Sequence, residues 1–155
     1  MVQILRTALF AIAVCPTAHF LAADWPMLGH DIARSGATPD GLRPPFERKW
    51  YRLFTDEGLM SGVQPVVADG KVFVGTLRGK LHAIDAETGT DVWSSSAGGV
   101  ILHTSAVAGG KVFFGCADGS VHAVGAANGL LAWKCETRGA KGQPFCRFPA
   151  PWRNR

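Results

Sequence analysis

The sequence of 155 residues is poor in charge, has no CxxC pair and contains no apolar run of about 20 residues. Charged residues make up 18% of the chain and hydrophobic residues 47%, whereas a disordered protein has few apolar residues and more charge. The missing CxxC spacing disfavours a structural zinc site. The short apolar runs predict that no segment spans a membrane.

The formal net charge of +4 is concentrated at the C-terminal end. Residues 24–133 hold 9 basic and 11 acidic residues, whereas residues 134–155 hold 6 basic residues and 1 acidic residue. A nucleic-acid-binding protein usually carries its basic patch on the folded body. The slightly acidic body therefore predicts that nucleic acid is not a partner.

The first 23 residues have the layout of a secretory signal peptide. Arg6 provides the positive charge, residues 7–14 form a short apolar run, and two alanines precede the expected cleavage after Ala23. We therefore expect export to the periplasm or the cell envelope. Residues 12–15 resemble a lipid-attachment box ending at Cys15, so a lipid-anchored form is an alternative, as is a buried N-terminal helix.

Export would place the chain in an oxidising compartment, where disulfides form. The mature chain would keep Cys116, Cys135 and Cys146. Because three is an odd number, at least one cysteine is unpaired or pairs between chains. We expect Cys116 to be a small buried strand residue.

Glycine is in excess, at 19 residues, and an internal repeat places many of these glycines. Residues 65–93 align without a gap with residues 105–133, and 13 of the 29 aligned positions are identical. Glycine destabilises helix interiors but suits tight turns. The composition and the repeat together favour an all-β fold.

Each copy of the repeat predicts four short strands joined by three tight turns. In the first copy the turns are expected at residues 69–70, 78–79 and 86–89, and the fourth strand carries Trp93. Four-stranded units of about 40 residues build β-propellers. The predicted fold class is therefore all-β: a partial β-propeller of two four-stranded antiparallel blades, with residues 49–54 as part of a preceding blade.

Residues 83–93 resemble the tryptophan-docking motif of pyrroloquinoline-quinone-like (PQQ-like) repeats, with Asp85, Gly89 and Trp93 at the motif spacing. The second copy keeps Ala, Gly and Trp at 123, 129 and 133, but has Gly125 in place of the aspartate. Residues 24–36 are similar to the leader that often precedes the first blade of these proteins. The chain thus resembles the PQQ-like β-propeller repeat family over residues 24–137.

Four segments are expected. These are a signal peptide at 1–23, a leader at 24–48, propeller repeats at 49–137, and an irregular basic tail at 138–155 in which residues 142–155 contain three prolines. The resemblance implies rings of seven or eight blades, more than this chain provides. The chain is then either a truncated or frame-shifted member, or a short protein that completes its ring by self-association.

The resemblance implies that family enzymes hold a quinone and a calcium ion on the propeller axis, with an aspartate base and often a vicinal disulfide. This chain has no adjacent cysteine pair, and its aspartates at 69, 85, 91 and 118 are expected in turns or docking positions. His82 and His122 occupy equivalent positions in the two copies, but no third ligand repeats with them. We therefore predict no catalytic, cofactor-binding or metal-binding residue, and no cofactor.

The predicted function is a non-catalytic, exported propeller-repeat module that acts as a protein-binding or assembly scaffold. Its expected partner is another protein or additional propeller blades, including those of a second copy. The alternative is a fragment of a PQQ-dependent quinoprotein dehydrogenase. Adding quinone and calcium to the protein and measuring the absorbance discriminates between the scaffold and the dehydrogenase.

Overall fold

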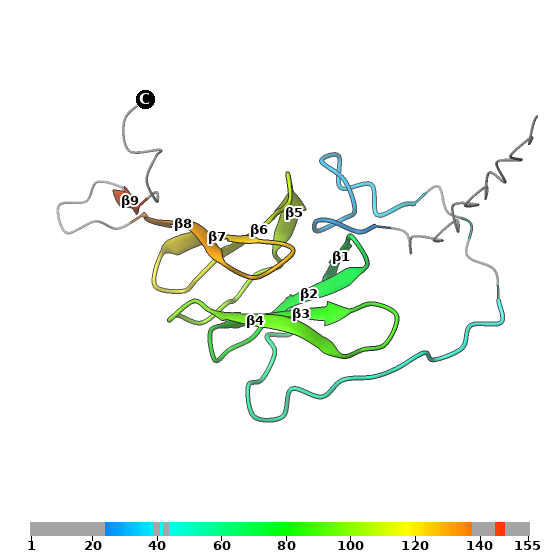
Figure 1. The fold of residues 1–155 in the computed structure, drawn as a ribbon. Helices are drawn as coiled ribbons and strands as arrows, with labels where there is room; N and C mark the ends of the chain where they lie inside the picture. Colours follow the sequence, from blue (N-terminus) through cyan, green and yellow to red (C-terminus); the bar gives the residue numbers. More distant parts are fainter. Residues whose placement is uncertain (1–23, 39–40, 42–43, 138–144, 148–155) are drawn as a thin grey trace, which may run out of the picture.

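The computed structural model describes residues 24–38, 41, 44–137 and 145–147, so the predicted signal peptide and most of the predicted tail lie outside the described residues. Within these residues the chain folds as two antiparallel sheets and has no helix (Figure 1). The prediction of an all-β, partial β-propeller is confirmed.

The first sheet has four strands in sequence order, as the repeat predicted. They are β1 (Val66–Ala68), β2 (Lys71–Gly75), β3 (Lys80–Asp85) and β4 (Asp91–Ser96). The second sheet repeats this order with β5 (Ala106–Ala108), β6 (Lys111–Gly115), β7 (Ser120–Gly125) and β8 (Leu131–Glu136), and adds β9 (Phe145–Arg147).

The strand register is the same in both sheets. Ala83 lies opposite Trp93 between β3 and β4, and Ala123 lies opposite Trp133 between β7 and β8. In both places the register shifts directly after the alanine. The identical residues of the repeat therefore produce identical pairing, down to the irregularity in the outer strand.

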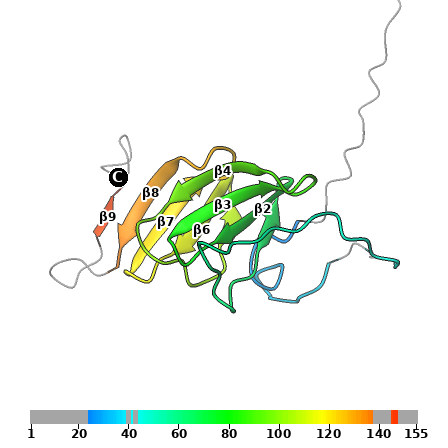
Figure 2. The same ribbon diagram turned by 90° about the horizontal axis from the view of Figure 1, so that it is seen from below.

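The two sheets pack face to face, and the strands of the first lie over those of the second in Figure 2. Alternation along each strand sends one set of side chains into the interface. Phe73, Leu81 and Ala83 of the first sheet are fully buried, and so is Val112 of the second. The remaining core residues come from both sheets and their connections: Val66, Ala68, Ala97, Ile101, Val107, Phe114, Val124 and Ala126.

The leader lies against the first strand of each sheet. Trp25 exchanges two backbone hydrogen bonds with Val67 of β1, at 2.7 and 2.9 Å. The backbone N–H of Val107 in β5 donates to the carbonyl of Pro26 at 2.7 Å. The leader therefore uses backbone groups that β1 and β5 would otherwise leave exposed at their edges.

Two sequence expectations need correction. The segment 138–155 was expected to be irregular, but β9 pairs antiparallel with β8 and places Cys146 opposite Cys135 in the register. A three-residue strand has too little alternation to be read from sequence, and it forms here on an edge that β8 supplies. Cys116 is a free, half-buried cysteine rather than a buried one, and Cys135 is disulfide-bonded.

Candidate functional site at the junctions between repeat units

Trp93 links the first sheet to the second. Its indole Nε1 donates to the carbonyl oxygen of Ala126 at 3.1 Å. A Cβ atom at Gly129 would lie only 2.5 Å from Cε3 of the Trp93 ring, so the ring lies directly on the glycine backbone. Gly129 also has a φ of 69° in the left-handed region, which glycine adopts without a steric penalty. The turn after β7 is thus shaped to receive the indole.

Trp50 makes the same contact with the first sheet. Its Nε1 donates to the carbonyl oxygen of Ala86 at 3.0 Å, and a Cβ atom at Gly89 would lie 2.8 Å from Cδ2 and Cγ of the ring. Residues 49–54 therefore occupy the same position relative to the first sheet that β4 occupies relative to the second sheet. We call this arrangement, an indole N–H on a carbonyl with the ring on a glycine three residues later, the Trp–Gly contact.

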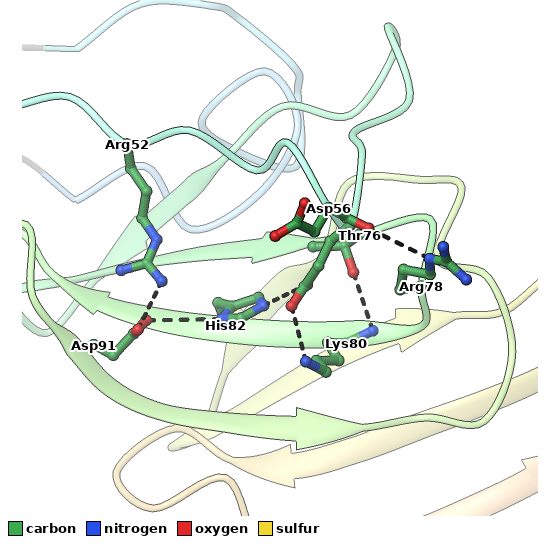
Figure 3. A network of polar contacts seen from close by, with 8 residues as sticks. Arg52, Asp56, Thr76, Arg78, Lys80, His82 and Asp91 are labelled. Carbon is green, nitrogen blue, oxygen red and sulfur yellow. Dashed lines mark hydrogen bonds and ion pairs between the residues drawn. The ribbon is translucent and has the colours of Figure 1, made fainter.

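A network of polar and charged side chains connects residues 52–57 with the first sheet (Figure 3). Glu57 contacts His82 Nε2 at 2.8 Å through Oε2 and Lys80 Nζ at 2.9 Å through Oε1. His82 Nδ1 lies 3.7 Å from Asp91 Oδ1, and Asp91 Oδ2 accepts from Arg52 Nη2 at 2.6 Å. The network therefore joins residues 52–57 to strands β3 and β4.

The charge state of Glu57 follows from these contacts. Burial raises its pKa, but hydrogen bonds from Lys80 and His82, together with the nearby His82 charge, outweigh burial and lower the pKa to about 2. Glu57 is therefore ionised at neutral pH. A carboxylate with so low a pKa is poorly suited to act as a general acid or base at that pH. Its role in this geometry is to hold a connecting segment on the sheet.

The equivalent histidine of the second sheet has different neighbours. His122 Nε2 lies 2.9 Å from Ser120 Oγ, and its ring stacks on Phe114 with 5.1 Å between centroids. Burial lowers the pKa of His122. Because Ser120 Oγ donates to Asp118 Oδ1 at 2.6 Å, the carboxylate holds the serine rather than orienting the histidine, unlike in a catalytic triad.

The carboxylate of Asp85 holds the turn that follows β3. Asp85 Oδ1 accepts from the backbone N–H groups of Glu87 and Thr88, at 3.0 and 2.7 Å, and from the Thr88 hydroxyl at 2.9 Å. The hydrogen bonds from Thr88 lower the pKa of Asp85. In the second copy, where Gly125 replaces the aspartate, Asn128 Oδ1 accepts from the backbone N–H of Leu130 at 3.1 Å.

The structure brings together residues that sequence reasoning kept apart. Glu57 lies outside the repeat, so no offset of 40 residues points to its contact with His82. The contact between Ser120 and His122 could have been predicted from the sequence, because residues two apart in a strand lie on the same face of the sheet. The two histidines themselves lie on different sheets and share no carboxylate.

The calcium ion and quinone implied by the family resemblance need a set of oxygen ligands. In the described ranges, no group of three or more His, Cys, Asp or Glu side chains is placed to hold a metal ion. The described residues therefore do not fit a calcium site, and we derive no reaction step through these groups.

The sheets, their register and the Trp–Gly contacts define a β-propeller repeat protein. The family model described as outer membrane protein assembly factor BamB matches residues 29–152, which is most of the chain. The chain belongs to this family of PQQ-like repeat proteins.

Solved structures of two functional kinds resemble the chain. Quinohemoprotein alcohol dehydrogenase from Comamonas testosteroni is 26% identical over 76% of this chain and 20% of its own length, with a TM-score of 0.54. The related enzyme ADHIIG from Pseudomonas putida HK5 is 24% identical over 75% and 19%, with a TM-score of 0.61. BamB from Moraxella catarrhalis is 25% identical over 50% and 22%, with a TM-score of 0.41.

The chain therefore spans about a fifth of the length of these structures. No curated protein sequence matches it significantly. A helix long and apolar enough to cross a membrane does not occur among the residues that the structure describes.

Proposed function

We propose that this chain is a non-catalytic part of an exported propeller that binds protein and acts as an assembly scaffold. The observation that carries the proposal is the Trp–Gly contact, which recurs at Trp50 and Trp93 with nearly the same geometry. The charged network at Glu57 and His82 also joins one segment to the next. The polar groups at the junctions therefore connect one repeat unit to the next.

The outer face of the second sheet supports a protein partner. Phe113 and Val121 are half-buried there, whereas their equivalents Phe73 and Leu81 are fully buried under the second sheet. Burying an aromatic ring and an aliphatic side chain favours association, at about 25 cal/mol per Å² of apolar surface. A further protein surface, a blade or a partner domain, is the natural cover for this face.

The matched family is described as an outer membrane protein assembly factor, which supports an assembly role in the cell envelope. The alternative is a piece of a quinoprotein dehydrogenase, favoured by the 26% identity to the Comamonas testosteroni enzyme. The two proposals differ in one measurable property, because only the dehydrogenase binds a quinone and oxidises an alcohol.

The test is a titration of the purified chain with pyrroloquinoline quinone in the presence of Ca²⁺. The scaffold proposal predicts no saturable change in quinone absorbance and no alcohol-dependent reduction of a dye. The Comamonas testosteroni enzyme, stripped of quinone and treated in parallel, is the positive control. Saturable binding by the chain with dye reduction would overturn the scaffold proposal.

Partner binding is tested by placing a photo-crosslinking residue on the exposed face. Phe113→p-benzoylphenylalanine is expected to crosslink in the cell envelope to a protein of the outer-membrane assembly machinery. The matched control is the same residue at Ile32, which is 94% exposed in the leader. Equal crosslinking from both positions would contradict a specific surface around Phe113.

A further inference from the structure

The second sheet has one strand more than the first. β9 runs antiparallel to β8, on the side of β8 away from β7 (Figure 2). Three residue pairs join the two strands, and the middle pair is Cys135 with Cys146. Among the described residues, β4 is the last strand of the first sheet, and Ser95 takes the position equivalent to Cys135. The cysteine therefore stands in the copy that carries the fifth strand.

The bonding state of the cysteines points to a single pairing. Cys135 is disulfide-bonded, whereas Cys116 is free. The sequence holds two other cysteines, Cys146 and Cys15, and the latter lies in the predicted signal peptide. Directly opposite residues of antiparallel strands have Cα atoms about 4.5–5.5 Å apart, and a disulfide needs about 4.4–6.8 Å. The register therefore brings the backbone of Cys146 within the distance that a disulfide to Cys135 requires.

Cys135 lies on the same face of the second sheet as Phe113. Residues directly opposite one another in a sheet share a face, and Cys135 lies opposite Val121. Val121 is two residues from Ala123 in β7, and Ala123 lies opposite Phe113. By the same register, residue 146 stands at a position of this face. β9 thus widens the face that carries Phe113 by one strand.

β9 is short, and its pairing with β8 depends on what holds it there. It has three residues and pairs along half of β8, which has six. A disulfide keeps two residues close even when the strands separate, and it thereby lowers the entropy lost when the strands pair. Loss of the disulfide is therefore expected to release β9 and to leave the backbone groups of residues 134–136 unpaired at the edge of the sheet.

We propose that a disulfide between Cys135 and Cys146 fastens β9 to the second sheet, and that a protein dithiol releases it. A thiolate of the dithiol attacks one sulfur, forms a mixed disulfide and displaces the other cysteine as a thiolate. The second thiol of the reductant then displaces the remaining cysteine, so the reductant leaves as a disulfide and both cysteines take up protons as thiols. This inference rests on the proposed scaffold function, because it names a regulation of the surface through which the scaffold binds protein.

Peptide mapping of the full chain tests the pairing. The oxidised protein is unfolded, its free thiols are alkylated with iodoacetamide, and it is digested with trypsin without reductant. Trypsin cleaves after lysine and arginine, so the two cysteines fall in separate peptides, residues 135–138 and 142–147. We expect one disulfide-linked pair of these peptides that separates on reduction, with Cys116 alkylated. A disulfide from Cys135 to any other cysteine, or alkylation of Cys135, would overturn the pairing.

Amide hydrogen exchange of the full chain, followed by NMR, tests the release of β9. Reduction with dithiothreitol is expected to speed exchange by roughly tenfold or more at those amides of residues 134–136 that point toward β9. Cys146→Ser should exchange as fast without reductant, and β6 and β7 should stay protected in both cases. Cys116→Ser is the matched control and should respond to dithiothreitol as the unchanged chain does. Slow exchange that persists after reduction would overturn the release.

The effect on protein binding is measured with the photo-crosslinking residue at position 113. Combined with Cys135→Ser and Cys146→Ser, this residue is expected to lose its crosslink to the partner, whereas Cys116→Ser should keep it. An undiminished crosslink in the variant without the disulfide would overturn the regulation. Quinone turnover, or no crosslink from the oxidised chain, would refute the scaffold function, while the digest and the exchange rates still decide whether the disulfide holds β9.

Discussion

Replacement of Gly129 by alanine tests the Trp–Gly contact directly. The new Cβ would lie 2.5 Å from Cε3 of Trp93, closer than two carbon atoms approach, so the indole must move off the turn. Gly70→Ala is a matched control. Gly70 has the same φ of 69°, but nothing lies within 4 Å of the position that a Cβ atom would take there.

The expected magnitudes separate the two variants. A left-handed conformation costs an alanine about 1–2 kcal/mol, and both variants incur this cost. Gly129→Ala adds overpacking against the ring, which typically costs about 1–3 kcal/mol. Displacing the indole also breaks the 3.1 Å hydrogen bond to Ala126, a further loss of about 0.5–1.5 kcal/mol.

The assay is urea unfolding, with the free energy of unfolding compared between Gly129→Ala and Gly70→Ala. We expect Gly129→Ala to be less stable than its control by at least about 1 kcal/mol. A Trp93→Leu background should remove most of this difference, since the clash depends on the ring. Equal losses in the two glycine variants would refute the reasoning, and so would a difference that persists without Trp93.

Three further outcomes follow from the structure. The pKa of Glu57, lowered to about 2, stabilises the fold above pH 4.5, and this contribution is lost as the pH falls toward 2. Glu57→Gln should therefore flatten the acid limb of the profile of unfolding free energy against pH. Ile101→Ala, at a fully buried position, should cost about 2–5 kcal/mol in urea unfolding and Leu102→Ala, half-buried, less. Because partial burial raises the pKa of the Cys116 thiol, its alkylation by iodoacetamide at pH 8 should be slower than that of free glutathione and should accelerate in urea. Equal rates for Cys116 and glutathione would contradict the raised pKa.

Much of the fold could be predicted because its determinants are local. Turn glycines such as Gly70 and Gly79 adopt positive φ, and alternating apolar residues between them predict the strands. The leader could be recognised by its residues, but its backbone pairing with Val67 could not, since any extended segment offers the same donors and acceptors. The site was less predictable still, because Glu57 meets His82 across 25 residues that carry no periodic signal.

The sequence by itself determined that this protein is built from stacked four-stranded units joined through tryptophans. Repetition every 40 residues fixes strand, turn and register through short-range chemistry that each copy carries in full. Only the tertiary structure decided that the leader pairs with β1 and β5, that β9 extends the second sheet, and that Glu57 is held ionised beside His82. These features depend on which distant segments meet, and contact between distant segments is a property of the packed chain rather than of any local pattern.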